Sequence, residues 1–409
     1  MSPITSPVAM PPVTLSSAPA TTSARVLSVD ILRGITIAFM ILVNDPGDWS
    51  HVYSQLDHAK WNGWTLTDLV FPSFLFLIGM SIIFSFQSRL SRGDSRLTLA
   101  GHLFRRSAII FAIKMFLSAY PHFHIAHIRI YGVLTRIALC YLFAGLICLW
   151  TRKIVPLACI TAGLLIGYWA LMRFVPVPGF GVPTRDIPLL DPIGNLTAWI
   201  DRGISAFTLR TINMGRLYRV TSDPEGLLST LPAIATTLLG SITAVFMRSP
   251  AYTPVTKRNV FALAGALFVA AGELWNRTFP INKNLWTSSY VLLAAGISLL
   301  GLALFYWLVD MQRIQDKSRI AKAALWPWLV FGSNAITAFV VSELFVETMG
   351  WIKFQDAGRT VSSWNWLYVH GFSHGNSTEA TSVAFALAFV IVCFIPNWLL
   401  WRKRIFLKI

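Results

Sequence analysis

Charged residues, cysteines outside apolar runs and the motifs of soluble enzymes are scarce or missing in this sequence. Only 13% of the 409 residues are charged, whereas 55% are hydrophobic, and the mean hydropathy is +0.60. This apolar content exceeds what one water-soluble core can bury, so we expect lipid to solvate much of the surface. The cysteines all lie inside apolar runs and form no CxxC pair, which argues against disulfides and thiolate metal sites: Cys140, Cys148, Cys159 and Cys393.

Three common catalytic signatures are also missing. The sequence has no HExxH zinc motif, no GxSxG elbow and no glycine-rich phosphate loop, so we expect neither a metal nor soluble-type nucleotide or hydrolase chemistry. Acidic residues number 18 against 34 Lys and Arg, which gives a formal charge of +16. The basic residues are spread in short clusters between apolar segments, as membrane topology requires, and we therefore expect no nucleic-acid partner.

What the sequence does contain is a series of apolar stretches long enough to cross a bilayer as helices. A spanning helix needs about 20 mostly apolar residues. The third stretch is the weakest because Lys114 interrupts it. We therefore predict an all-α, polytopic transmembrane bundle of about ten spans, at 27–45, 67–87, 104–120, 131–150, 155–174, 228–247, 259–277, 286–309, 325–346 and 381–401.

The connections between these stretches alternate in basic charge. Segments 46–66 and 278–285 hold one lysine each, Lys60 and Lys283, whereas the intervening connections are rich in Arg and Lys. The positive-inside rule then places both termini in the cytoplasm, which an even number of spans also requires. Residues 1–24 lack a basic n-region and an apolar h-region, and they are predicted to be a disordered tail before a membrane domain at 25–409.

The densest polar cluster lies in the first predicted outer loop, VNDPGDWSHVYSQLDHAKWNGWTLTDLVFP. A histidine can exchange a proton near neutral pH or attack an acyl carbon, so His58 and His51 are both candidate catalytic groups. Asp57 or Asp68 could orient the imidazole. Composition alone favours an interfacial histidine in a Trp-rich belt over a catalytic one. Polar residues in the spans likewise allow structural ion pairs without a substrate.

Five separated motifs resemble one known family in type and order. They are RVLSVDILRGITIAFMILVN with HAKWNGWTLTDLVFPSFLFLIGMSI, then RIYGVLTRIALCYL, DPEGLLSTLPAI, PINKNLWTSSY and GSNAI. This set, spread over about residues 25–400, resembles the heparan-α-glucosaminide N-acetyltransferase family of transmembrane acyltransferases, which includes bacterial NagX-like members. The resemblance implies an enzyme that transfers acetyl from acetyl-CoA, its co-substrate, to the amine of a glucosamine-type sugar. Region 25–409 would then be the transmembrane acyltransferase domain.

The resemblance also assigns roles to particular positions. The family's active-site histidine lies in an HAxWNG motif, which matches His58 and not His51, and an asparagine that ends the first span matches Asn44. Asn44 would donate to the oxyanion, with Asp68 as the third catalytic residue. The stretch between Asn44 and His58 is longer than in animal lysosomal members, we expect no counterpart of their large luminal domain, and Thr135 stands where many members have Gln. These departures bear on the acceptor more than on the donor.

Other positions are candidate ligands of the two substrates. Arg33 and Lys283 lie in matching motifs and could bind the anionic groups of CoA, as could Arg105 and Arg106. The further candidates are Arg136, Asn282, Asn284, Trp286 and Asn334 for CoA, and Asp57, Trp61, Asn62 and Glu225 for the sugar.

Two other functions remain open from the sequence. One is a transporter for an amino sugar such as N-acetylglucosamine, although the halves show no convincing repeat. The other is an O-acetyltransferase that acts on a cell-surface glycan. In each case we expect a multi-pass protein of the cytoplasmic (inner) membrane, with the His58 loop on the periplasmic or extracellular side, the lipid bilayer around it and a homodimer as one candidate assembly.

Overall fold

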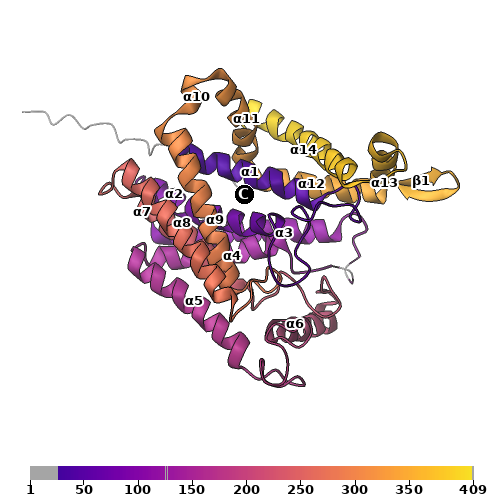
Figure 1. Cartoon of the computed structure of the whole chain (residues 1–409), viewed down its shortest axis with the longest axis horizontal. Helices are drawn as coiled ribbons and strands as arrows, with labels where there is room; N and C mark the ends of the chain where they lie inside the picture. Colours follow the sequence, from indigo (N-terminus) through magenta and orange to yellow (C-terminus); the bar gives the residue numbers. More distant parts are fainter. Residues whose placement is uncertain (1–25, 125, 127, 408–409) are drawn as a thin grey trace, which may run out of the picture.

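The computed structural model describes residues 26–124, 126 and 128–407, so the predicted disordered tail at 1–24 lies outside the described residues. Long helices make up most of the described chain, and one antiparallel hairpin projects from the side of the bundle (Figure 1). The elements are α1 (Leu27–Asn44), η1 (Thr67–Leu69), α2 (Val70–Leu90), α3 (Arg96–Ala119), α4 (Val133–Trp150), α5 (Ile154–Phe174), α6 (Leu196–Ile212), α7 (Thr230–Arg248), α8 (Pro254–Asn276), α9 (Ser288–Phe305), η3 (Tyr306–Met311), α10 (Ile314–Lys317), α11 (Arg319–Ser333), α12 (Ala335–Trp351), β1 (Lys353–Asp356), β2 (Arg359–Ser362), α13 (Ser363–Tyr368), η4 (Val369–Ser373) and α14 (Glu379–Arg402).

The described helices confirm the prediction of an all-α, multi-pass membrane protein. In the described part of the chain, eight helices are long and apolar enough to cross a membrane. A ninth candidate consists of α11 and α12 together, bent by 81° at their junction. The predicted stretch 104–120 lies in α3 up to Ala119; this helix carries Arg105, Arg106 and Lys114 and is not among the eight. The orientation of the bundle stays a prediction.

The ninth predicted stretch, 325–346, is not one straight helix. It is interrupted at Asn334, whose φ of −133° and ψ of 47° lie outside the helical region. The amide of Asn334 instead holds the C-terminal tail, donating through Nδ2 to the Ile405 carbonyl at 3.1 Å and accepting from the Leu407 N–H at 2.9 Å. The break thus places α11 and α12 in different directions and ties both to the end of the chain.

Small residues allow the central helices to pack closely. A Cβ on Gly79 of α2 would lie 1.8 Å from the Thr237 carbonyl oxygen, and one on Gly240 of α7 would lie 1.8 Å from that of Phe76. The Ser241 hydroxyl donates to the Gly79 carbonyl at 3.0 Å across the same contact. Because lipid offers no hydrophobic drive for two apolar helices to associate, such close packing and hydrogen bonding stabilise the pair.

The long connection between α5 and α7 is partly helical and folds against the bundle. Its helix, α6, begins at Asn195, whose side chain accepts from the Ala198 N–H at 2.9 Å as an N-cap. Buried side chains from α5, this connection and the α8–α9 loop form a second apolar cluster, which includes Tyr168, Met172, Leu196, Phe279 and Leu285. This cluster fixes the loop segments around the site described next.

Candidate active site

Two large cavities lie toward opposite ends of α1. The first, which we call the His58 cavity, has a volume of about 690 Å³ and includes Asn44 at the end of the helix. The second, the Arg33 cavity, has a volume of about 830 Å³ and includes Asp30 and Arg33 near its start. Among the predicted site residues, the His58 cavity brings together Asn44, Asp57, His58, Glu225, Lys283 and Asn284.

His58 is paired with a buried carboxylate. Its Nδ1 lies 2.7 Å from Oδ1 of Asp68, whose side chain is only 1% exposed, whereas the side chain of His58 is 38% exposed and lines the cavity. A carboxylate accepts at this distance, so Nδ1 carries the proton and Nε2 presents a lone pair. The sequence-predicted pair of His58 and Asp68 is therefore brought together, in the arrangement that orients a general base.

The local fold holds the Asp68 carboxylate in place. Besides His58, its oxygens accept from the backbone N–H groups of Ala59 at 3.1 Å and Thr65 at 3.0 Å. The Thr65 hydroxyl also donates to it at 3.2 Å. Asp57 accepts from the His58 backbone N–H at 2.7 Å. The loop around His58 is thus closed on the first turn of the next helix, which fixes the imidazole.

Lys283 provides a positive charge beside the same ring. Its Nζ lies 3.2 Å from Nε2 and 3.4 Å from Nδ1 of His58. A donor on the axis of the Nε2 lone pair would lie much farther from Nδ1 than from Nε2, so Lys283 leaves that lone pair accessible. Burial lowers the pKa of Lys283 below its ordinary value, against the opposing effect of the Glu225 and Asp68 carboxylates.

An ion-pair network that sequence reasoning missed forms another part of the cavity wall. Arg129 donates to both oxygens of Asp223, at 2.7 and 2.5 Å, and to Glu225 at 2.5 Å. Burial lowers the pKa of Arg129, but the two carboxylates together outweigh it and raise the pKa above its ordinary value. The arginine lies just before the fourth predicted span in a family motif, and the acids lie in the next motif. Arg129 and Asp223 lie 94 positions apart, so no local sequence pattern predicts that they pair.

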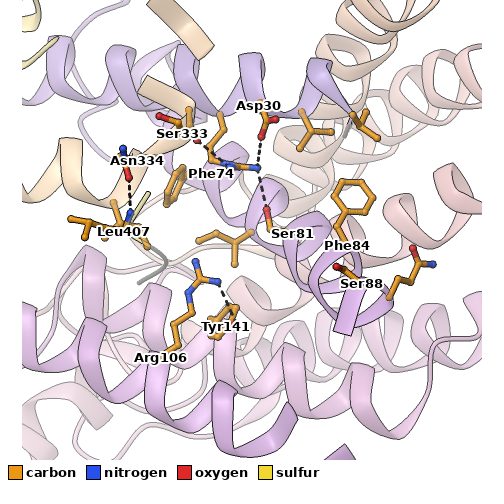
Figure 2. A pocket seen from close by; sticks show the side chains of 18 of the residues that line it. Asp30, Phe74, Ser81, Phe84, Ser88, Arg106, Tyr141, Ser333, Asn334 and Leu407 are labelled. Carbon is orange, nitrogen blue, oxygen red and sulfur yellow. Dashed lines mark hydrogen bonds and ion pairs between the residues drawn. The ribbon is translucent and has the colours of Figure 1, made fainter. Parts of the chain in front are cut away.

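The Arg33 cavity is rich in arginine. Arg33 itself pairs with Asp30 at 3.2 Å and donates to the Gly332 carbonyl at 3.1 Å. Figure 2 shows Arg106 of α3 over the ring of Tyr141, with its Cζ 4.7 Å from the ring centroid. Arg92 and Arg248 complete the set of arginines around this cavity. Nε atoms of Arg106 and Arg248 are buried without a hydrogen-bond partner among the described residues.

Several predicted ligands lie outside both cavities. Arg136 is 1% exposed, donates to the Gly226 carbonyl at 3.0 Å and stacks 4.9 Å over the Trp286 ring. The buried Trp286 in turn donates to Thr236 at 3.1 Å. The other predicted ligands outside the cavities connect loops. The Asn282 amide donates to Asn62 at 3.2 Å, and Trp61 donates to the Leu190 carbonyl at 2.8 Å.

The contacts of His51 and Asn334, two further candidate residues, indicate their structural roles. His51 pairs with Asp48 at 2.8 Å and does not line the His58 cavity, whereas Asp48 also accepts from Ser377 at 2.6 Å. Asn334 lines the Arg33 cavity together with Leu407 of the tail that it holds. Asp48 therefore links this loop to the C-terminal segment and holds His51 outside the cavity, and Asn334 shapes the arginine-rich cavity.

Comparison with known proteins agrees with the motif evidence. Residues 25–197 match the family model described as heparan-alpha-glucosaminide N-acetyltransferase, catalytic. The human protein named heparan-alpha-glucosaminide N-acetyltransferase is 30% identical over 434 aligned positions, which cover 94% of this chain, and the mouse protein of the same name is 28% identical over 432 positions, also 94%. The chain spans 60% of the length of each relative. The matched family model, the two relatives and the multi-pass helical fold all agree with the resemblance of this chain to the heparan-α-glucosaminide N-acetyltransferase family.

Proposed function

We propose that this protein is a transmembrane acyltransferase that moves an acetyl group from acetyl-CoA to the amine of a glucosamine-type sugar. The observation that carries the proposal is the approach of the two cavities along α12. Ile336 lines the Arg33 cavity and Phe339 lines the His58 cavity. Three helical residues rise about 4.5 Å, so a cavity suited to an anionic co-substrate ends about one turn from a cavity that holds a His–Asp pair.

In this proposal the Arg33 cavity receives the coenzyme. The phosphates of acetyl-CoA carry several negative charges, and guanidinium groups bind phosphate through paired, charge-assisted hydrogen bonds. Arg33, Arg106 and Arg248 face this cavity. Its position toward the predicted cytoplasmic ends of the spans agrees with the cytoplasmic source of acetyl-CoA.

His58 then acts on the acceptor from the other cavity. Nε2 takes a proton from the sugar amine, the nitrogen attacks the acetyl carbon, and a C–N bond forms as the C–S bond breaks. The leaving thiolate takes up a proton, so the ammonium and thioester yield an amide, free thiol and one released proton. Asn44 and the Lys283 ammonium are the donors proposed for the developing negative charge, a type of interaction worth about 3 to 4 kcal/mol.

A two-step route through an acetylated His58 uses the same atoms. Nε2 would form the bond to the acetyl carbon, release the thiolate, and then pass the acetyl group to the sugar amine. Incubation with labelled acetyl-CoA and no sugar separates the routes. Label retained on the peptide that contains His58 supports the two-step route, and its absence at full transfer activity supports direct attack.

The His58→Ala variant tests the assignment. We expect at least about a 10²-fold loss of acetyl transfer because the general base is removed, while binding of CoA in the Arg33 cavity is retained. The measurement is transfer from labelled acetyl-CoA to glucosamine by purified protein, with CoA affinity measured separately. The matched control is His51→Ala, which removes a histidine from the same loop outside the cavity. Full activity of His58→Ala would contradict the proposal.

The two rival functions predict different products in the same assay. Uptake of amino sugar into proteoliposomes without consumption of acetyl-CoA would indicate a transporter. Acetylation of a hydroxyl acceptor in preference to an amine would indicate an O-acetyltransferase.

A further inference from the structure

A third cavity lies where α4 and α5 meet at the membrane surface, and the proposed acetyl transfer makes no use of it. Both helices qualify as membrane spans, and only three residues, 151–153, connect them. That connection must therefore lie at one face of the bilayer. The cavity beside it has a volume of about 450 Å³, and we call it the Arg152 cavity.

Three cations surround the Arg152 cavity. Arg96 comes from the first turn of α3, and Arg152 and Lys153 come from the connection. No carboxylate lines the cavity, and within the described chain none of the three side chains takes part in an ion pair. All three are exposed. The cavity therefore concentrates positive charge that is not neutralised by the described part of the protein.

The rest of the cavity and its surroundings are apolar. Ile83, Leu149 and Val245, from α2, α4 and α7, also line it. Trp150, another lining residue, is 72% exposed, and Leu97, the neighbour of Arg96, is 83% exposed. Tryptophan prefers the headgroup zone of a bilayer. The site thus combines cations with an exposed apolar rim at the depth where a phospholipid has its phosphate and the start of its acyl chains.

We propose that the Arg152 cavity binds the headgroup of an anionic phospholipid, with the phosphate near Arg96, Arg152 and Lys153 and the acyl chains along Trp150. Basic pockets between spans on the cytoplasmic side are suited to anionic headgroups. The positive-inside pattern predicts that side for this connection. A free phosphate would explain the cations alone, whereas a lipid also accounts for the exposed apolar rim.

The competing ligand is the coenzyme itself, because Gln87 lines both this cavity and the Arg33 cavity. The two ligands make opposite predictions. If the cavity holds lipid, loss of its cations leaves the affinity for CoA unchanged. If it holds a phosphate of CoA, the affinity for CoA falls with them, and CoA competes with the lipid.

The test uses the purified full-length protein and its triple variant Arg96→Gln, Arg152→Gln, Lys153→Gln. Native mass spectrometry measures binding of phosphatidylglycerol, with phosphatidylcholine and glycerol 3-phosphate as separate ligands. We expect the wild type to prefer phosphatidylglycerol and the triple variant to bind it about tenfold more weakly or worse, since each cation near a membrane surface contributes to anionic lipid binding.

The matched control is the triple variant Arg402→Gln, Lys403→Gln, Arg404→Gln, which removes the same charge from an exposed cluster at the end of α14. We expect it to bind phosphatidylglycerol as the wild type does. Equal losses in both variants, equal binding of phosphatidylcholine, or a parallel loss of CoA affinity in the first variant would each overturn the proposal. Thermal unfolding of both variants checks that they remain folded.

Discussion

Lys283 lies beside both ring nitrogens of His58, although the sequence indicated a contact with the coenzyme phosphates. The two roles predict different kinetics. A phosphate contact removed by Lys283→Met would raise KM for acetyl-CoA and leave kcat nearly unchanged. A charge that acts at the reacting atoms would lower kcat instead.

We expect Lys283→Met to lower kcat for acetyl transfer about tenfold or more, with little change in KM for acetyl-CoA. Steady-state kinetics against both substrates measure the difference. Lys60→Met is the control, because Lys60 lies in the loop between α1 and α2 but does not line the His58 cavity. A large rise in KM for acetyl-CoA at unchanged kcat would instead indicate that Lys283 binds the coenzyme phosphates.

Asp201 of α6 makes stability depend on pH. Its Oδ1 accepts from the Leu227 N–H at 3.0 Å, whereas Oδ2 is buried without a partner in the described chain. Burial raises the pKa of Asp201 to about 7, and Asp223 adds to the rise while Arg136 and Arg202 oppose it. An unfolded aspartate has a pKa of about 3.9. Its stabilising contribution is therefore complete below about pH 4 and is lost as pH rises through about 7.

We expect Asp201→Asn to raise the thermal unfolding midpoint at pH 8 and to reduce its fall between pH 5 and pH 8, since the amide keeps the acceptor for Leu227 and carries no charge. Asp186→Asn, at an exposed position in the same connection, serves as the control. An unchanged pH dependence in Asp201→Asn would show that other groups produce it.

At the scale of the helices, the sequence predicts where each span lies along the chain better than where a helix bends. Apolar length located eight spans, because the cost of burying polar backbone and charge in lipid acts over a local window of about 20 residues. The break at Asn334 was not predicted, because the partners that satisfy its amide are Ile405 and Leu407, about 70 positions away. Similarly, the HAxWNG motif located His58 from the sequence alone. The pairing of Arg129 with Asp223 could be seen only in the structure, because the two residues lie 94 positions apart.

The α2–α7 contact gives a prediction for a helix pair. Gly240→Ala places a Cβ within 1.8 Å of the Phe76 carbonyl oxygen, so the helices must separate. We expect a loss of stability of about 1 to 3 kcal/mol or more, measured as a lower unfolding midpoint in detergent. Gly163→Ala is the matched control, because nothing lies within 4 Å of a Cβ there on α5. Equal midpoints for the two variants would contradict the close packing.

Across the whole molecule, the two cavities open the bundle from opposite ends of α1 and approach each other along α12. Figure 1 shows α12 beside α1, on the side of the bundle that leads to α13. Under the proposed function, this arrangement would keep the coenzyme and the sugar on different sides of the membrane. Only the acetyl group then has to pass from one cavity to the other.

The most direct test of this account is acetyl transfer in proteoliposomes of known orientation, with labelled acetyl-CoA on one side and glucosamine on the other. We predict N-acetylglucosamine when acetyl-CoA faces the Arg33 cavity and glucosamine faces the His58 cavity, and no product in the reversed arrangement or with His58→Ala. Equal product in both arrangements from sealed vesicles, or product only when both substrates face the His58 cavity, would contradict transfer across the membrane.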